Sequence, residues 1–428
     1  MYQLNIVDYS FVSNVWKNTS VINGFFFLES NDIKNTLNII KKNILFNIEN
    51  NIFYRMILEE DSSKTFFPFL SVGPKPTIDN CVSTETVESI KTDFQQIINR
   101  EFKNPINPSE KLWHIHIVSC PQEKTIAIIL RMHHVLGDGS VFLSFIKSLF
   151  NPKKSRLNLI KYRNIKNLYL IFNIIKWYFI NIINLIKRLN KDKNIRNLPE
   201  NTYSEKWQKQ YSDNKIIKYE SIPYSLFKNL MNKHSLNFQS LIIYLYSKTC
   251  HQYIDLQSKT LLAGVAINTA KHKYGTYIHT LLCNTHSDLF GILDEQKIMN
   301  LIKNSLEKEK TFFYNTEAIN KYKIFCSSPF KKHYKKAWGY FYPKSANTYL
   351  SITSHKKMTL GVNDAVLKNY YVVQPYPEIH GSSGIAINVH RNEEYVNITL
   401  LGYPERVKYV ENFLEDFKKN LINMTDNK

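Results

Sequence analysis

The sequence predicts an α/β protein built in two halves, and three observations support this fold class. The stretch Thr125–Arg131 is β-branched and almost continuously apolar, as expected of a buried strand. Gly137 and Gly139 follow and give a turn its backbone freedom, after which apolar residues recur at helical spacing through residue 150. The chain has 428 residues, 43% of them hydrophobic, which is enough for a large core and two domains.

The periodicity of apolar residues predicts the other elements in chain order. In the first half we expect a strand at Gly24–Leu28, a helix at Ile33–Ile44, a strand at Asn51–Leu58, a loop at Asp61–Cys81, a helix at Glu85–Arg100 and an alternating strand from Trp113. In the second half we expect a helix at Ser235–His251, a strand at Leu261–Ile267, a helix at Glu295–Lys308, a strand within Trp338–Lys357, strands at Tyr371–Pro377, Gly384–His390 and Tyr395–Gly402, and a final helix at Arg406–Asn423.

The two halves are joined by a segment that turns basic after Asn151 and continues as a long apolar run, Asn167–Leu189. Its interrupting polar residues fall on one face of a helix, and they are Asn173, Lys176, Asn181, Asn184, Lys187 and Arg188. A broad apolar face with basic flanks favours a helix lying at a membrane interface. Two alternatives stay open: a crossover helix packed on the protein itself, and a true membrane span.

The end of the first long strand carries a group of residues typical of a catalytic loop. His133 and His134 close the strand, and Asp138 follows between two glycines, the second of which is Gly139. A hydroxyl group becomes an effective nucleophile only if a base takes its proton as the new bond forms. A neutral imidazole, with an ordinary pKa of about 6.5, suits that task near neutral pH.

The pattern His-His-x-x-x-Asp-Gly resembles the signature of acyltransferases related to chloramphenicol acetyltransferase. That superfamily includes the condensation domains of peptide synthetases and the wax ester synthase/diacylglycerol acyltransferases. Residues 7–11, Val-Asp-Tyr-Ser-Phe, are similar to an early Val-Asp-x-x-Phe motif of the latter family. Residues 102–118 resemble its proline loop, Pro-Leu-Trp and alternating strand, with Lys111 in place of the last proline.

The resemblance implies two chloramphenicol acetyltransferase-like sandwich domains that pack as a pseudo-dimer around a central tunnel. The domains would be residues 1–155 and 201–428, with residues 156–200 as the crossover. The implied activity is transfer of a fatty acyl group from acyl-coenzyme A to a long-chain alcohol or diacylglycerol, with no cofactor besides that co-substrate. His134 would be the general base, His133 would orient and pack, and Asp138 would hold the loop through a basic partner.

Several departures leave alternatives open. Cys283-Asn284 stands where the family has Gly-Asn, and Lys271 is the nearest basic residue to an expected arginine, so Asp138 has no assigned partner. The donor that stabilises the oxyanion is not identified, and Ser287 and Ser351 are the two candidates. The alternative function is an inactive acyltransferase fold that binds lipid or membrane.

Charge and cysteine usage exclude other classes. The 56 Lys and Arg outnumber 36 Asp and Glu, but they are spread along the chain without a recognised binding module, so we expect no nucleic-acid partner. Five scattered cysteines without Cys-x-x-Cys argue against a disulfide framework or a zinc site. His114 and His116 share one face of their strand, but no further ligand cluster accompanies them, and we predict no metal. With no secretory pattern at the start, we expect a cytoplasmic protein, or one on the cytoplasmic side of the endoplasmic reticulum or at a lipid droplet.

Overall fold

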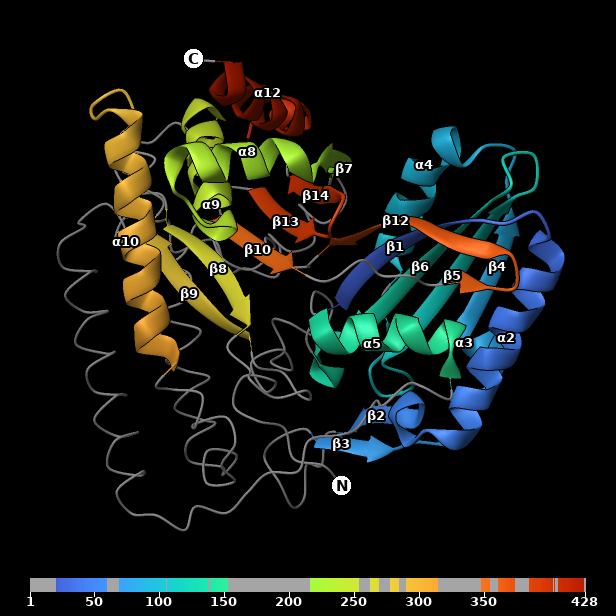
Figure 1. The fold of residues 1–428 in the computed structure, drawn as a ribbon. Helices are drawn as coiled ribbons and strands as arrows, with labels where there is room; N and C mark the ends of the chain where they lie inside the picture. The colour runs from blue at the N-terminus through green and yellow to red at the C-terminus, as the bar shows by residue number, and fades with distance from the viewer. Residues whose placement is uncertain are drawn as a thin grey trace, which may run out of the picture.

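Two six-stranded sheets form the frame of the molecule, and helices pack on each (Figure 1). In this computed structural model, the described residues are 21–59, 69–104, 106–137, 139–152, 216–253, 262–268, 278–284, 290–314, 348–354, 361–373, 385–402, 404 and 407–426. The arrangement of alternating strands and helices confirms the predicted α/β class.

The order of strands in both large sheets departs from their order in the chain. From edge to edge, the first sheet consists of β11 (Gly361–Val362), β12 (Ala365–Val373), β1 (Val21–Glu29), β6 (Thr125–His133), β5 (Trp113–Cys120) and β4 (Val82–Thr86). The second consists of β7 (Ile216–Pro223), β14 (Tyr395–Gly402), β13 (Ile385–Arg391), β10 (Thr348–Ser354), β8 (Leu262–Asn268) and β9 (Ile278–Asn284). A short third sheet pairs β2 (Met56–Glu59) with β3 (Phe69–Val72).

Helices cover both faces of the first sheet. The described helices of this half are α2 (Ile33–Asn50), α3 (Ile78–Cys81), α4 (Ile90–Lys103) and α5 (Gly139–Phe150), with 3-10 turns η1 (Ile52–Arg55) and η2 (His134–Leu136). Alternate residues of β6 point to opposite faces, so Ile128 and Leu130 join the core under α2 and α5, while Ile129 joins the core under α4. Burial on both sides explains why β6 reads as a continuous apolar run.

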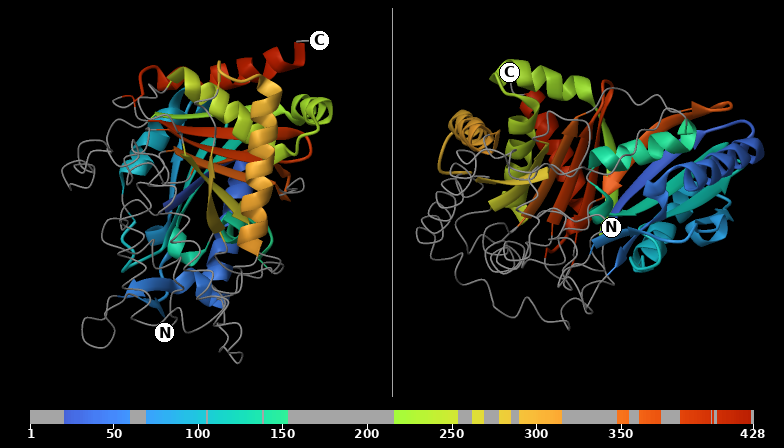
Figure 2. Two further views of the ribbon diagram at one scale, coloured as in Figure 1. Left: turned by 90° about the vertical axis from the view of Figure 1, so that its left-hand side faces the viewer. Right: turned by 90° about the horizontal axis from the view of Figure 1, so that it is seen from below.

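The helices of the second half pack together on one side of the second sheet (Figure 2). They are α8 (Tyr224–His234), α9 (Phe238–Tyr253), α10 (Glu295–Tyr314) and α12 (Phe413–Asp426), the last preceded by the turn η10 (Val410–Asn412). Ala386 and Leu401 of the second sheet share one buried cluster with Phe94 of α4 and Phe25 of β1. The two halves are therefore joined through a common apolar core.

One strand crosses from the late part of the chain into the first sheet. β12 pairs antiparallel with β1 from Asn23↔Val373 to Glu29↔Val366. The turn before it is fixed by Asp364, whose carboxylate accepts hydrogen bonds from Ser30 Oγ (2.8 Å) and the Asn31 amide (2.6 Å). The proposed division into residues 1–155, 156–200 and 201–428 stays a prediction. Strand β12 belongs to the last of these ranges but is part of the first sheet.

Several predicted boundaries were wrong, and local polarity explains the errors. Glu85 lies in strand β4, so helix α4 starts at Ile90 and the prediction from residue 85 was too early. The first part of the strand expected at Asn51–Leu58 is η1, in which the Asn51 side chain accepts a hydrogen bond from the Phe53 amide (3.0 Å). Strand β7 and helix α8 were not predicted. The expected strand at Tyr371–Pro377 is the end of β12, which begins at Ala365.

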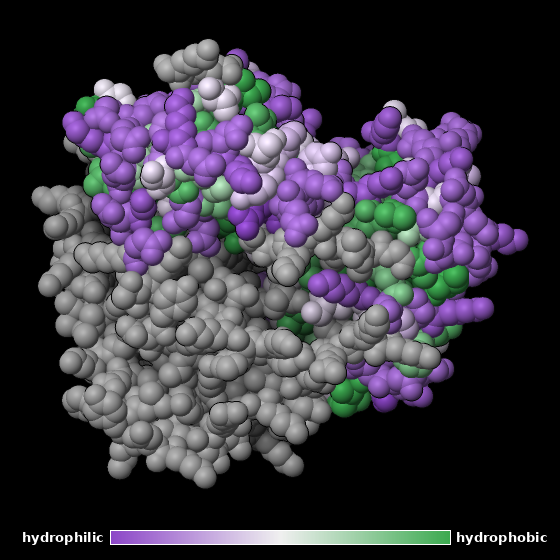
Figure 3. Space-filling view, in the orientation of Figure 1, coloured by the Kyte–Doolittle hydropathy of each residue, from purple (hydrophilic) through white to green (hydrophobic). Residues whose placement is uncertain are grey.

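The surface of the described residues is mostly hydrophilic in the view of Figure 3, with smaller hydrophobic areas on the half that carries the first sheet. Among the described helices, none combines the length and the apolar character needed to cross a membrane. The segment Asn167–Leu189 lies outside the described residues, so the structure tests none of its three interpretations.

Candidate functional site

The two predicted histidines lie at the end of the central strand β6. His133 is the last residue of β6 and pairs with Val21 of β1, and its amide donates to the Leu112 carbonyl (2.7 Å). His134 then begins η2, and both side chains are buried, at 0% and 3% exposure. Burial at the end of a central strand fixes the position of both imidazoles through the packing of their neighbours.

Local hydrogen bonds determine the tautomer of His133. Its Nδ1 accepts a hydrogen bond from the Val135 amide (3.2 Å), so the ring proton of the neutral form is on Nε2. That Nε2 is buried and has no hydrogen-bond partner in the part of the chain that the structure describes. A buried donor without an acceptor is costly, which marks this end of β6 as a place where a polar ligand group would be stabilising.

The turn after the histidines requires glycine at position 137. Gly137 has φ 153° and ψ −179°, a backbone conformation open almost only to glycine. A Cβ atom there would also lie 2.5 Å from the side chain of Val141. Gly139 begins helix α5, and Asp138 between them lies outside the described residues. The structure therefore places His133, His134 and Gly139 together, while the role of Asp138 stays a prediction.

Burial keeps both imidazoles neutral over a wide pH range. Desolvation lowers the pKa of His134 to about 4. Desolvation, with a smaller effect of neighbouring His134, lowers the pKa of His133 to about 3. At neutral pH each ring therefore has a nitrogen lone pair, as a general base must.

These lowered pKa values predict that the protein becomes less stable as the pH falls from 7 to 5. In the unfolded chain an imidazole takes up a proton near pH 6.5, whereas the folded protein resists protonation down to about 4 for His134 and about 3 for His133. Within that window the unfolded state binds more protons, so the free energy of unfolding falls by up to about 1.4 kcal/mol per pH unit for each such histidine. The loss ceases below the folded-state pKa values.

Urea unfolding at pH 7, 6 and 5 measures this dependence. The matched control is His133→Asn, whose amide oxygen can still accept from the Val135 amide but does not titrate. Its free energy of unfolding should change less steeply with pH than that of the parent. An equal slope in both proteins, or a flat profile in the parent, would contradict the assigned protonation states.

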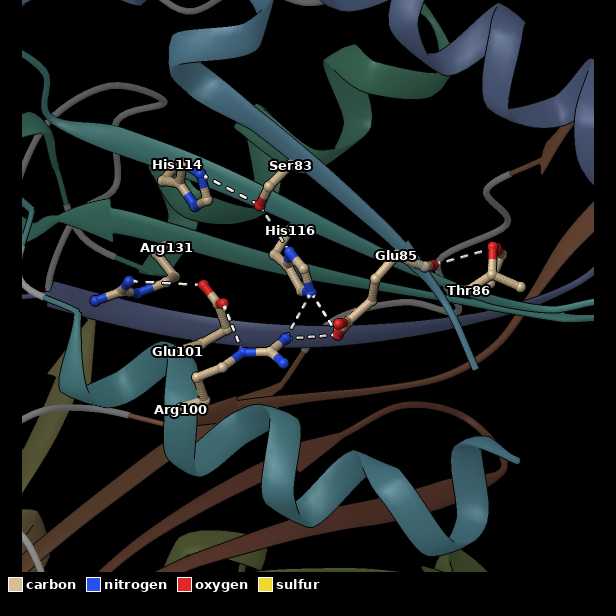
Figure 4. Close-up of polar contacts among 9 residues, drawn as sticks. Ser83, Glu85, Thr86, Arg100, Glu101, His114, His116 and Arg131 are labelled. Atoms are coloured by element: carbon tan, nitrogen blue, oxygen red, sulfur yellow. Dashed lines mark hydrogen bonds and ion pairs between the residues drawn. The ribbon is translucent and has the colours of Figure 1, made fainter. Parts of the chain in front are cut away.

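The His114 and His116 pair lies one strand away, on β5, and its predicted shared face is confirmed by a common neighbour. The Ser83 hydroxyl is 3.5 Å from His114 Nε2 and 2.6 Å from His116 Nδ1 (Figure 4). His116 Nε2 lies 2.8 Å from Glu85. No group of three or more histidine, cysteine or acidic side chains that could hold a metal ion occurs among the described residues.

A polar cavity of about 400 Å³ adjoins these histidines, and the sequence prediction missed most of its members. Arg131 of β6, opposite His114 in the sheet, contributes to its wall together with Arg100 and Glu101 of α4. Arg131 precedes His133 by two residues on the same face of β6, a spacing that signalled its location. The α4 residues gave no comparable signal.

The remaining predicted site residues are two serines and one lysine. Ser351 is buried in the middle of β10, opposite Asn388 of β13. Ser287 and Lys271 lie outside the described residues. The oxyanion donor and the basic partner of Asp138 therefore stay predictions.

Comparison with solved structures identifies the fold. The chain resembles a wax ester synthase/diacylglycerol acyltransferase from Marinobacter aquaeolei VT8, with a TM-score of 0.64 at 13% identity over 99% of both chains. It resembles the condensation domain of the monacolin K polyketide synthase (TM-score 0.63, 8% identity, 99% of this chain and 97% of that one). The starter condensation domain of rhizomide synthetase, solved with C8-CoA and a leucine thioester analogue, gives 0.62 at 9% identity over 99% and 94%.

The described part of the chain therefore has the fold of these solved structures, which confirms the predicted fold class. No family model matches the sequence, and no curated protein matches it either. At these identities the likeness establishes the architecture, and the activity has to be argued from the residues.

Proposed function

We propose that this protein is an O-acyltransferase that moves a fatty acyl group from acyl-coenzyme A to a hydroxyl group of a long-chain alcohol or diacylglycerol. The observation that carries the proposal is the pair of buried, neutral imidazoles at the end of β6, followed by the glycine turn and helix α5. A wax ester synthase/diacylglycerol acyltransferase is among the solved structures with a similar fold, which supports the proposal.

The chemistry assigned to His134 is that of a general base. As the hydroxyl oxygen attacks the thioester carbonyl carbon, His134 takes the hydroxyl proton. The carbon–sulfur bond then breaks, and the imidazolium returns the proton to the departing thiolate. Burial holds His134 in its neutral form at physiological pH, so the nitrogen lone pair that takes the proton is present. The hydrogen bond from the Val135 amide to His133 Nδ1 spans His134 and so fixes the backbone from which its side chain projects.

The proposal is tested by incubating the purified protein with radiolabelled long-chain acyl-coenzyme A and either hexadecanol or diacylglycerol. Thin-layer separation should show a labelled wax ester or triacylglycerol that requires both substrates. If the protein forms neither product but binds vesicles containing these lipids, the inactive lipid-binding alternative replaces the proposal. Release of free fatty acid without ester would instead indicate a thioesterase.

We further propose that Asn167–Leu189 brings the protein to a membrane or lipid-droplet surface. The substrates named above are insoluble in water, so the enzyme needs access to a lipid phase. Replacing Phe172, Phe179 and Ile183 with serine removes much of the apolar face. The variant is expected in the soluble fraction after membrane flotation, and turnover of short, soluble substrates should persist.

The matched control changes the polar face that the sequence predicts for the same segment. Replacing Asn173, Asn181 and Asn184 with serine also makes three substitutions but leaves the apolar face intact. This control should float with the membranes as the parent does. Misfolding and aggregation of the apolar-face variant alone would show that those side chains pack on the protein's own core, and the membrane proposal would then be wrong.

A further inference from the structure

The cavity on the first sheet has more basic than acidic side chains in its wall. Arg100, Lys111 and Arg131 contribute to its wall, and Glu101 is the one carboxylate among its described lining residues. The wall comes from four separate elements, namely strands β4, β5 and β6 and the end of helix α4 with the segment that follows it (Figure 4). Three cations against one anion give the cavity a net positive charge.

Arg131 is the central residue of this cavity. It is only 5% exposed, and although burial lowers the pKa of its guanidinium to about 10, it is still charged at neutral pH. One Nη donates to the Asn104 carbonyl (2.5 Å), and the other lies 3.9 Å from Glu101. Its Nε is buried with no hydrogen-bond partner among the described residues. A buried, charged donor that lacks a hydrogen-bond partner is stabilised by an acceptor that enters the cavity.

His114 gives a second, independent indication. Its Nδ1 is also buried without a hydrogen-bond partner in the described part of the chain. Desolvation, followed by the positive charges of Lys111 and Arg131, lowers the pKa of His114 to about 3. The ring is therefore neutral at pH 7 and able to donate one hydrogen bond, and the cations beside it produce a positive field at the cavity.

Glu85, a second acidic residue beside the cavity, already has two partners. Glu85 accepts from Arg100 (2.6 Å) and lies 2.8 Å from His116 Nε2. His116 is held in turn by Ser83 (2.6 Å), and Arg100 lies 3.7 Å from Glu101. These contacts fix one wall of the cavity and pair Arg100 with Glu85. The remaining positive charge is carried by Arg131, which lies beside Glu101, and by Lys111, whose Nζ donates to the Asn80 carbonyl.

We propose that this cavity is a binding site for an oxyanion group, a phosphate or a carboxylate, carried by a small molecule. The Arg131 guanidinium and the Lys111 ammonium supply the charge, and Arg131 Nε and the His114 ring supply hydrogen-bond donors. Arg131 and His133 face the same side of β6, about 7 Å apart along the strand. The bound anion would thus lie beside the strand end that carries the two histidines. The site goes beyond the acyl transfer proposed above and does not depend on it.

Calorimetric titration of the intact protein with inorganic phosphate, and separately with acetate, tests the proposal. Both series are run at pH 7 with ionic strength held constant by sodium chloride. We expect one saturable site per chain, and the anion that binds more tightly identifies the group as phosphate or carboxylate. In parallel, NMR at pH 7 should show the imidazole signals of His114 shifting as the anion saturates the site.

Two variants connect the binding to this cavity. Lys111→Gln removes one cation from the cavity rim and should raise the Kd several-fold. The paired replacement Glu101→Gln with Arg131→Met removes both members of the buried ion pair, so that neither charge is left unpaired. It should raise the Kd roughly tenfold or more, the scale of a lost charge-assisted hydrogen bond.

The control is Lys368→Gln on β12, which removes the same charge from an exposed pair with Glu29 (2.8 Å). Its Kd should equal that of the parent. The proposal is overturned if neither anion binds saturably to the parent, or if Lys111→Gln and Lys368→Gln have the same Kd. Neither outcome affects the ester-forming assay, so failure of this site and failure of the proposed acyl transfer are distinguishable.

Discussion

Replacing His134 with alanine is expected to lower the rate of ester formation by about 10²–10⁴-fold, the usual effect of removing a general base. The hydroxyl acceptor then has no group to take its proton, while the acyl donor can still bind. Because the loss lies in the chemical step, kcat should fall much more than KM rises. Initial rates with labelled acyl-coenzyme A and alcohol measure both constants.

The control for this substitution is His251→Ala. His251 is exposed at the end of α9, where its ring packs near Phe290, and it belongs to the other half of the molecule. This variant should retain the parent rate within a factor of two or so. The melting temperature of His134→Ala must be compared with the parent to exclude a folding defect. Activity within a few-fold of the parent in a folded His134→Ala protein would remove His134 from the base role.

The largest effect on stability is expected for Trp113→Ala. The indole is 1% exposed and packs against the rings of Tyr54 and Phe145, with centroid distances of 5.4 and 5.3 Å. Its Nε1 donates to the Tyr54 carbonyl (2.9 Å). The substitution therefore leaves a cavity and removes the donor from a buried carbonyl, at a cost of about 3–5 kcal/mol in the free energy of unfolding.

Urea unfolding of three variants separates these contributions. Trp113→Phe keeps an aromatic ring but loses the hydrogen bond, so it should cost less than Trp113→Ala. Tyr409→Ala removes an aromatic side chain that is 69% exposed and should change the free energy of unfolding by no more than about 0.5 kcal/mol. A loss below about 1 kcal/mol for Trp113→Ala would mean that the core between β5, α5 and η1 relaxes around the missing ring.

The sequence was most informative where one element carries its own pattern. Strand β6 and helix α5 were predicted nearly to their ends, because a strand buried on both faces reads as a continuous apolar run and the helix presents apolar residues at a fixed period. Strand β4 was missed for the opposite reason. It is an edge strand, Val-Ser-Thr-Glu-Thr, with alternating exposure and a short length, so its polarity resembles that of a loop.

The same distinction applies to the sites. His133 and His134 are contiguous, so the motif could be recognised without knowledge of the fold. The basic cavity is assembled from residues between Ser83 and Arg131 on separate elements, and although Arg131 shares a face of β6 with His133, no local pattern links it to His114, Arg100 or Glu101. Only the antiparallel register, which places Arg131 opposite His114, brings them together.

The pairing of β12 with β1 has a consequence for the order of events during synthesis. Strand β1 leaves the ribosome early, but its second partner is not available until residue 373 has been made. Until then one edge of β1 presents unpaired backbone amides and carbonyls, which is the structural feature most prone to association with other chains. Closing this pair also joins residues some 340 positions apart, a contact whose loop-closure entropy slows folding. We therefore expect the protein to depend most on chaperones in the period after β1 and before β12 has been synthesised.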